Sequence, residues 1–362
     1  MHEQLPILPT AVVGSYPVPE WMERLKTDCL RGRLSSVQLA DIHEMAIKAA
    51  LRDQELAGVD IVSDGELRRD NDIDYFLAKL PGLCIAQRAK DFYFDYYDVA
   101  LDKPLPPQSG QEFSWLADDY AFTASHTGKP IKFSFTGPFS LACRITNTSG
   151  LDRRALMEAI AHRLNAAAHA LAARGATLLQ IDEPFLAGQP SEVVDAVAAI
   201  NVVTAGVNVS WALHVCYGNR YARPLWEGHY DFLFPAVLDA NVDQLVLEFA
   251  RKGYADLPVI EKFGWDRKIG LGVIDVKSQQ VETADVVTNR IRAALELVPA
   301  EQLVINPDCG LRNLSGAVAR AKLGAMVEGA VAARRLVDQT PVVDQLPVVT
   351  DEVAPDPITQ GA

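Results

Sequence analysis

Short apolar runs alternate with longer amphipathic stretches along most of this chain. The runs are of strand length, are rich in Val, Ile and Leu, and cover residues 10–13, 59–62, 131–135, 177–181, 209–213, 244–247, 268–274 and 303–305. Apolar positions then recur with helical spacing over residues 35–56, 152–174, 191–205, 232–238, 284–297 and 315–336. This rhythm is typical of strands that each lead into a helix.

The helical stretches carry signals at their ends. Ser35 and Asp152 stand where an N-cap side chain accepts a hydrogen bond from the first helical turn. Gly58 and Gly175 stand where a left-handed residue ends a helix. The two prolines within residues 17–19 exclude a helix immediately after the first run, because proline restricts its own backbone and that of the residue before it.

Residues 80–126 interrupt the rhythm. The aromatic run Phe92–Tyr97 predicts a strand in an inserted hairpin, and the proline-rich residues 103–107 predict a loop. Beyond Gln339 the chain is rich in Pro, Asp and Val, so we predict a tail over residues 341–362 that wraps the surface or frays.

Eight strand-then-helix units with no linker-like composition predict one α/β domain. We expect a single (β/α)8 TIM barrel over residues 1–340, with the hairpin and loop inserted after its second strand. The loops after the strands of such a barrel converge on one mouth, where active sites lie. Polar residues follow the predicted strands at Gly14, Ser15, Glu66, Thr136, Asp182, His214, Cys216, Glu248, Asp275 and Cys309. These residues are therefore expected to share one site.

Charge and cysteine content narrow the possible partners. The formal charge of -13 argues against nucleic acid or an anionic membrane surface as a partner. No apolar segment is long enough for a membrane span, and the first four residues lack a secretory leader. Five scattered cysteines fit free or metal-bound thiols in a reducing compartment better than a disulfide framework. We expect a cytoplasmic enzyme that acts on small molecules, as a monomer or a homo-oligomer.

His214, Cys216 and Cys309 form the candidate metal site. Residues two apart on a strand point to the same side, so His214 and Cys216 would face the mouth together. An imidazole and two thiolates suit Zn²⁺ better than Mg²⁺ or Ca²⁺, and Glu248 at the end of the next strand is the natural fourth ligand. Each residue taken alone is more often an ordinary core residue. Ligands drawn from several strands favour a catalytic site, and two thiolates suit a metal that holds a nucleophilic thiolate.

Glu66 and Asp182 indicate what the mouth binds. Two carboxylates facing each other would bind an ammonium group, and Gly14-Ser15 offers N–H and hydroxyl donors for a carboxylate. Together they describe a pocket for an α-amino acid. The alternative for each acid is helix capping or pairing with a nearby arginine.

These motifs resemble a known family. The chain is similar to the catalytic barrel of cobalamin-independent methionine synthase, in its short form, over roughly residues 8–335. The resemblance rests on motifs in the same order as in that family: Val13-Gly14-Ser15, Asp64-Gly65-Glu66-Leu67-Arg68-Arg69-Asp70-Asn71, Gln180-Ile181-Asp182-Glu183-Pro184, His214-Val215-Cys216-Tyr217 and Asn306-Pro307-Asp308-Cys309-Gly310-Leu311.

The resemblance implies a zinc-dependent transfer of a methyl group to the thiol of homocysteine. It implies the zinc ligands His214, Cys216, Glu248 and Cys309. It also implies contacts of homocysteine with Ser15, Glu66 and Asp182, and a zinc-bound sulfur that attacks the methyl group.

Two positions depart from the family pattern. The long synthase has a tryptophan that stacks on the folate where this chain has Arg144, and a histidine proposed as a proton donor where it has Lys277. The identity of the methyl or alkyl donor therefore stays open. Arg144 and Lys277 could meet an anionic donor or the charge that develops on its leaving group. Their alternative is a pair of rim charges, solvated or paired with Asp64 or Glu183.

Other functions remain open at this point. Epoxyalkane:coenzyme M transferase belongs to the same superfamily and opens epoxides with a zinc-bound thiolate. Arg144 and Lys277 favour that alternative, whereas Glu66 and Asp182 oppose it because coenzyme M has a sulfonate and no amine. A uroporphyrinogen decarboxylase-like barrel is more remote, since it would not need the cysteines. A non-catalytic zinc-binding or thiol-binding protein would not need the acidic pair.

Overall fold

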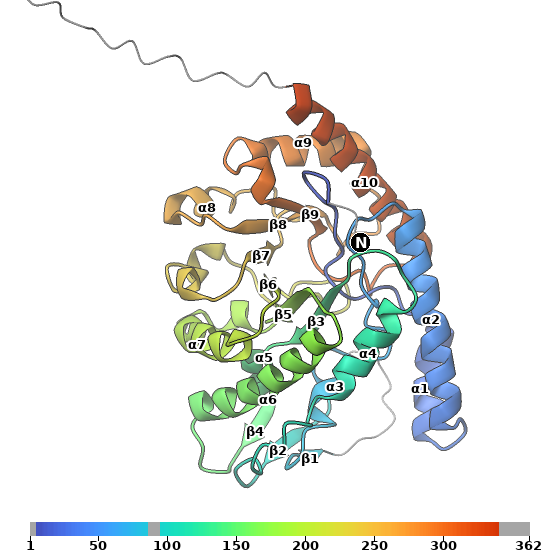
Figure 1. Cartoon of the computed structure of the whole chain (residues 1–362), viewed down its shortest axis with the longest axis vertical. Coiled ribbons are helices and arrows are strands. Elements are labelled where there is room, and N and C mark those ends of the chain that lie inside the picture. Colours follow the sequence, from blue (N-terminus) through green and yellow to red (C-terminus); the bar gives the residue numbers. More distant parts are fainter. Residues whose placement is uncertain (1–4, 86–94, 340–362) are drawn as a thin grey trace, which may run out of the picture.

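The main sheet of this protein is built from parallel strands that follow one another in chain order. The computed structural model describes residues 5–85 and 95–339. The strand order is β3-β5-β6-β7-β8-β9, and all neighbours are parallel (Figure 1). The strands are β3 (Lys132–Thr136), β5 (Leu178–Asp182), β6 (Ser210–Val215), β7 (Gln244–Leu247), β8 (Lys268–Ile274) and β9 (Leu303–Pro307). Because the strands are parallel, their carboxyl ends meet at one edge, and the chain is an α/β protein with a mostly parallel sheet.

The first two apolar runs form isolated bridges in place of the longer strands that we predicted. Parallel bridges join Thr10 to Ile305, Ala11 to Ile61, and Val62 to Ile131, the residue before β3. These bridges place the first two runs between β9 and β3. Val13, Ala212 and Val246 pack together in one buried cluster, so the first run also meets β6 and β7.

Asp60 accounts for part of this shortening. Its carboxylate accepts hydrogen bonds from the N–H and the hydroxyl of Thr10, both at 2.8 Å. The N–H of Thr10, which could otherwise bond to a neighbouring strand, is thus hydrogen-bonded to the Asp60 side chain. The same oxygen accepts a bond at 2.7 Å from Arg334 on the last helix, so Asp60 joins three distant parts of the chain.

Long helices lie outside the strands (Figure 1). Those that the pattern predicts are α2 (Ser36–Leu56), α6 (Arg153–Ala173), α7 (Val193–Thr204), α9 (Ala284–Leu295) and α10 (Gly316–Gln339). Ser35 forms a capping box with Gln38, and Asp152 accepts a hydrogen bond from the N–H of Ala155 at 2.7 Å. Gly58 has the left-handed φ of 83° expected after a helix end.

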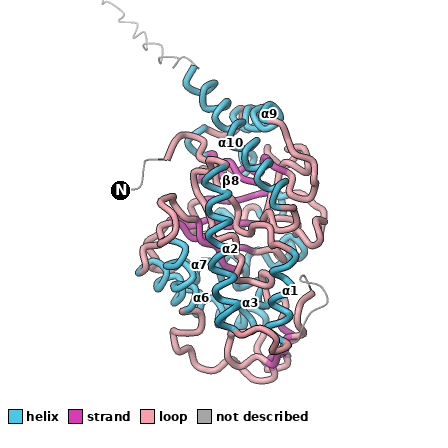
Figure 2. Tube along the Cα trace, turned by 90° about the vertical axis from the view of Figure 1, so that its right-hand side faces the viewer, coloured by secondary structure: helices cyan, strands magenta, loops and turns pink. Residues whose placement is uncertain are grey.

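Other helices were not predicted. Helix α1 (Glu20–Leu30) begins directly after Pro19, which is its N-cap, so excluding a helix there was wrong. Proline blocks a helix interior but is tolerated at the start, where its missing N–H has no helical partner. Helices α1 and α2 lie along the same side of the molecule (Figure 2). The remaining additions are α3 (Asp74–Leu77), α4 (Trp115–Ala124), α5 (Pro138–Cys143) and α8 (Pro258–Phe263).

The predicted helix over residues 232–238 is instead two short 3-10 helices, Tyr230–Leu233 and Ala236–Asp239. Pro235 lies between them and has no N–H to continue a helical ladder, which explains the division. Within the described residues, no helix is both long enough and apolar enough to cross a membrane.

A small second sheet lies beside the main one. Strand β1 (Cys84–Ile85) pairs antiparallel with β2 (Val99–Leu101), which pairs in parallel with β4 (Ile145–Asn147). The predicted strand Phe92–Tyr97 lies in part outside the described residues, and its residues 95–97 are not in a strand. The predicted insertion, residues 80–126, also contains helix α4.

We predict that Asp60→Ala destabilises the protein by about 2–3 kcal/mol, because it removes hydrogen bonds to a charged group and leaves Arg334 without its carboxylate. Urea unfolding measures this change. The control is Asp118→Ala, which removes an exposed partner of Arg174 and should cost less than about 1 kcal/mol. Equal effects of the two substitutions would contradict a special role of Asp60.

Candidate active site

His214, Cys216 and Cys309 meet at the carboxyl edge of the sheet. His214 is the fifth residue of β6, Cys216 follows the end of this strand, and Cys309 follows β9. Their ligand atoms all lie within 4.8 Å of one another, and the two sulfur atoms are 3.5 Å apart. All three residues are buried. The structure therefore brings the distant Cys309 to His214 and Cys216, and the three form a possible metal-binding group.

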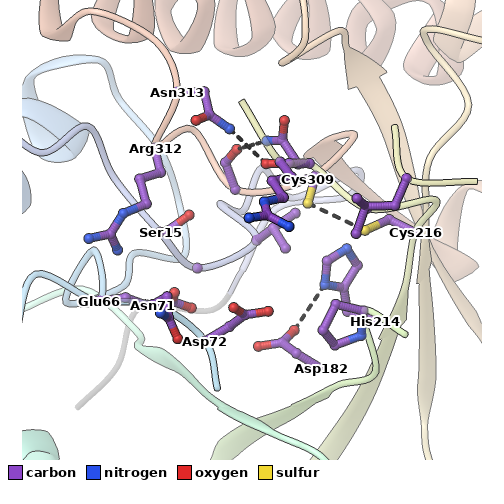
Figure 3. A pocket seen from close by; sticks show the side chains of 18 of the residues that line it. Ser15, Glu66, Asn71, Asp72, Asp182, His214, Cys216, Cys309, Arg312 and Asn313 are labelled. Atoms are coloured by element: carbon purple, nitrogen blue, oxygen red, sulfur yellow. Dashed lines mark hydrogen bonds and ion pairs between the residues drawn. The ribbon is translucent and has the colours of Figure 1, made fainter. Parts of the chain in front are cut away.

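The ring of His214 is oriented by Asp182. These residues pair directly in the β5–β6 register, and Nδ1 of His214 lies 2.9 Å from Oδ1 of Asp182 (Figure 3). The other ring nitrogen, Nε2, is buried and has no hydrogen-bond partner. A carboxylate that holds one nitrogen of a histidine while the other is free for a metal is a common arrangement at metal sites. The unpartnered nitrogen and the two sulfurs thus fit a soft divalent metal ion.

Charge in this cluster favours an ionised sulfur. The hydrogen bond with Cys309 lowers the pKa of Cys216 well below its usual range, and His214 lowers it further. The same bond raises the pKa of Cys309. Burial opposes protonation of His214, but the neighbouring Cys216 and Asp182 raise its pKa to about 10. The contacts in this cluster therefore favour the thiolate at Cys216, which is the form in which a cysteine binds a metal.

Glu248 and Lys277 lie together, outside this cluster. Glu248 follows β7 and is fully buried. Its Oε2 lies 2.7 Å from Nζ of Lys277, and its Oε1 lies 2.6 Å from Nε of Arg251. Burial opposes the charge of Lys277, but Glu248 and the two cysteines raise its pKa. Lys277 is therefore paired with Glu248 and is not a solvated rim charge.

A pocket of about 110 Å³ opens beside the cluster (Figure 3). The expected residues that line it are Gly14, Ser15, Glu66, Asp182, His214, Cys216 and Cys309. Glycine is needed at two points of close approach. A Cβ atom on Gly14 would come within 2.3 Å of Oε1 of Glu66, and one on Gly310 would come within 1.9 Å of Oγ of Ser15.

Glu66 is held in an unusual backbone conformation. Its φ of 56° lies in the left-handed region, which a residue with a side chain rarely adopts, and its N–H donates to Asp64 at 2.9 Å. Such strain is typical of functional sites. The Glu66 side chain accepts a bond from the Ser134 hydroxyl at 2.8 Å and lies 3.4 Å from Arg69. Burial raises the pKa of Glu66.

Several residues of the pocket were not assigned from the sequence. They are Asn71, Asp72, Tyr96, Phe185, Arg220, Arg312 and Asn313. Burial and the charge of Glu66 raise the pKa of Asp72 to about 6. Asp72 directly follows the motif that ends at Asn71, and Arg312 follows the one that ends at Leu311, so extending the motifs by one residue would have found both. Tyr96 and Arg220 lie in irregular segments that carry no such signal.

Arg144 contacts one residue of the pocket wall. It is not among the residues that line the pocket, but its guanidinium lies 4.7 Å from the ring centre of Tyr96, which does line it. Arg220 lies 5.5 Å from the same ring. Arg144 therefore contacts the lining of the pocket at Tyr96.

These features define a class of protein: an α/β enzyme with a possible thiolate–imidazole metal site beside an acidic substrate pocket. Residues 8–332 match the family described as cobalamin-independent synthase, catalytic domain. The chain belongs to this family and is a methyltransferase.

Known relatives agree with this assignment. The methionine synthase of Saccharolobus solfataricus is 34% identical over 330 residues, covering 90% of this chain and 95% of that protein. The solved structure of a B12-independent methionine synthase from Shewanella sp. W3-18-1, in complex with selenomethionine, is similar with a TM-score of 0.79 and 29% identity, covering 92% of this chain and 99% of that chain. A methyltransferase from Methanosarcina mazei shares the fold, with a TM-score of 0.62 at 15% identity, over 93% of this chain and 96% of that chain.

We predict that the protein binds about one zinc ion per chain, and that Cys216→Ser and Cys309→Ser abolish this binding, because each removes a soft ligand. Metal analysis after zinc loading measures the effect, and circular dichroism checks that the fold is kept. Cys84→Ser, at an exposed cysteine outside the cluster, should retain the metal. Full zinc content in Cys309→Ser would exclude this cluster as the site.

Proposed function

We propose that this protein transfers a methyl group to the thiol of homocysteine and so forms methionine, with zinc as its metal. The observation that carries this proposal is that the His214/Cys216/Cys309 cluster and the acids Glu66 and Asp182 line one pocket. A thiol site beside an ammonium site is what an amino-acid thiol requires. Support also comes from the relatives named methionine synthase and from the neighbour bound to selenomethionine, the selenium analogue of the expected product.

The three clustered residues would hold zinc. When bound there, zinc would act as a Lewis acid and keep the thiol of the acceptor ionised at neutral pH. Asp182 would keep the His214 ring oriented through Nδ1, leaving Nε2 for the metal. The family resemblance adds Glu248 as a fourth ligand, although its carboxylate is paired with Lys277 and Arg251.

The acidic side of the pocket would bind the ammonium group of the acceptor. Glu66, Asp72 and Asp182 gather there (Figure 3), and a buried ammonium would balance their charges. Ser15 would contact the carboxylate through its hydroxyl. A coenzyme M acceptor fits less well, because these carboxylates would repel its sulfonate and it has no amine to bind them.

The aromatic wall would contact the methyl donor. Tyr96 lines the pocket, and the guanidinium groups of Arg144 and Arg220 lie 4.7 Å and 5.5 Å from its ring centre. Such a wall suits a flat or anionic donor, and we propose it as the counterpart of the tryptophan platform in the long synthase.

We also propose that the isolated bridges complete a (β/α)8 barrel. They join the runs at residues 10–11 and 61–62 to β9 and to the start of β3. Closure in this way would place Ser15 and Glu66 beside the other strand ends, on the same mouth.

Glu66→Gln should weaken homocysteine binding about 10- to 100-fold, because it removes a charge-assisted contact to a buried ammonium. Zinc content should stay unchanged, since Glu66 does not belong to the metal cluster. Calorimetric titration of zinc-loaded protein measures the affinity. The matched control is Glu158→Gln, at an exposed position of α6, which should bind as the wild type does. Better use of coenzyme M than of homocysteine by the wild type would overturn the proposed acceptor.

Binding of homocysteine should release about one proton per chain, because the thiol binds as a thiolate. Affinity should therefore rise with pH until the free thiol itself ionises, at about pH 8.5. Titration in buffers of different ionisation enthalpy counts the protons. Binding without proton release would mean that the sulfur stays protonated and is not bound by the metal.

Arg144→Ala should lower turnover with the true methyl donor while leaving this proton release unchanged, because Arg144 supports Tyr96 and not the acceptor. The control Arg174→Ala removes an exposed arginine paired with Asp118 and should keep full turnover. Full turnover of Arg144→Ala would exclude this wall as the donor contact.

A further inference from the structure

Helices α1 and α2 carry an unusual share of the exposed apolar side chains. Val37, Met45 and Leu56 of α2 are 69%, 61% and 66% exposed, and Trp21 and Leu30 of α1 are 56% and 49% exposed. These are five of the thirteen large apolar side chains that are exposed among the described residues. The two helices lie along one outer side of the molecule (Figure 2). Exposed apolar residues that gather on one face indicate an interaction surface, whereas single ones do not.

The exposed apolar residues of α2 alternate with exposed charged residues in one stripe. Successive members are three or four residues apart, the spacing that places side chains on the same face of a helix. They make up the α2 stripe: Val37, Asp41, Met45, Lys48, Arg52 and Leu56. The side chain of Arg52 is 65% exposed, and its 3.6 Å contact with Glu55 in the next turn is too weak to withhold it from a partner.

The α2 stripe is complementary to itself when one copy is reversed. Two copies of α2 that run antiparallel about a two-fold axis at the level of residues 46 and 47 bring symmetric positions together. The pairs are then Val37 with Leu56, Asp41 with Arg52, and Met45 with Lys48. The two-fold axis repeats each pair, so the contact has two ion pairs, an apolar pair at each end, and methionines on the lysine stems at its centre. Parallel helices about a two-fold axis would instead place each charge against its own copy.

Helix α2 presents this stripe on a rigid support. Its first turn is fixed by the capping box of Ser35, and its inner side is buried at Ile47 and Leu51. The side-chain amide of Gln54 bonds to both the N–H and the carbonyl of Ser63, each at 3.0 Å. A surface that is held in one conformation before binding loses less entropy on association.

We propose that the α2 stripe is the interface of a symmetric homodimer, in which Asp41 of each copy pairs with Arg52 of the other. The partner is a second copy of this chain because the charges of the stripe match their own reversed order. Trp21 on the neighbouring helix α1 adds an aromatic contact at the margin, a residue type that is enriched at interfaces. The pocket is lined by other segments, so this dimer is independent of the proposed reaction.

Sedimentation equilibrium of the full-length protein tests the dimer. The wild type should associate with a Kd of about 10 µM, as expected for a small and partly polar interface. Asp41→Arg and Arg52→Asp should each weaken association about tenfold or more, because each places like charges opposite one another. The double variant Asp41→Arg/Arg52→Asp should return to within about threefold of the wild type, since it exchanges the two charges and keeps their attraction.

An equimolar mixture of the two single variants should also form dimers, because each chain then meets the opposite charge at both ion pairs. Met45→Arg should weaken association as well, since it brings a positive charge to Lys48 at the centre of the contact. The matched control is Val194→Arg on α7, where Val194 is 68% exposed, and it should associate as the wild type does. Circular dichroism checks that these surface variants keep the fold.

Three results would overturn the homodimer. The first is a wild type that stays monomeric at about 100 µM, ten times the expected Kd. The second is a dimer that persists in either single charge variant, which would place the contact on another surface. The third is a double variant, or a mixture of the single variants, that stays monomeric, which would show that Asp41 and Arg52 do not pair.

Discussion

Burial at the carboxyl edge of the parallel sheet is the constraint on which the rest of the site depends, because a charge removed from water needs an opposite charge or hydrogen bonds. Asp182 is held by His214, Glu66 lies near Arg69, and Glu248 is held by Lys277 and Arg251. The pairing of Asp182 uses only one nitrogen of His214, so Nε2 is left beside the two sulfurs. The candidate metal site thus follows from how the neighbouring charges are balanced.

One residue links the two halves of the proposed chemistry. Asp182 orients the His214 ring and also lines the pocket in which we place the acceptor's ammonium group. Binding of an ammonium there would act on the same carboxylate that holds the metal ligand, so acceptor and metal would influence each other through one side chain. Glu66, which has its own partners in Ser134 and Arg69, does not have this double role.

The residues that this chain shares with its family and the residues at which it departs from the family pattern lie at different places relative to the pocket. The motifs around Glu66, Asp182, His214 and Cys309 match the family and line one pocket. The departures at Arg144 and Lys277 do not line that pocket; Arg144 contacts the ring of Tyr96, and Lys277 is paired with Glu248. Substitutions at such positions change the charge near the reacting groups without removing a residue that contacts the substrate.

Local signals in the sequence were enough to predict the six long strands, the capped helices α2 and α6, and the strand-end positions of His214, Cys216 and Cys309. These features depend on hydrophobic period, cap chemistry and alternation along one strand, all of which act within a few residues. The tertiary structure alone decided the charge pairs that join separate loops. Lys277 could not be matched to Glu248 from the sequence, and Arg144 could not be placed beside Tyr96, because these contacts join separate loops. Their geometry is set by strand order and register and by the burial of the residues concerned, which depend on parts of the chain far from them in the sequence.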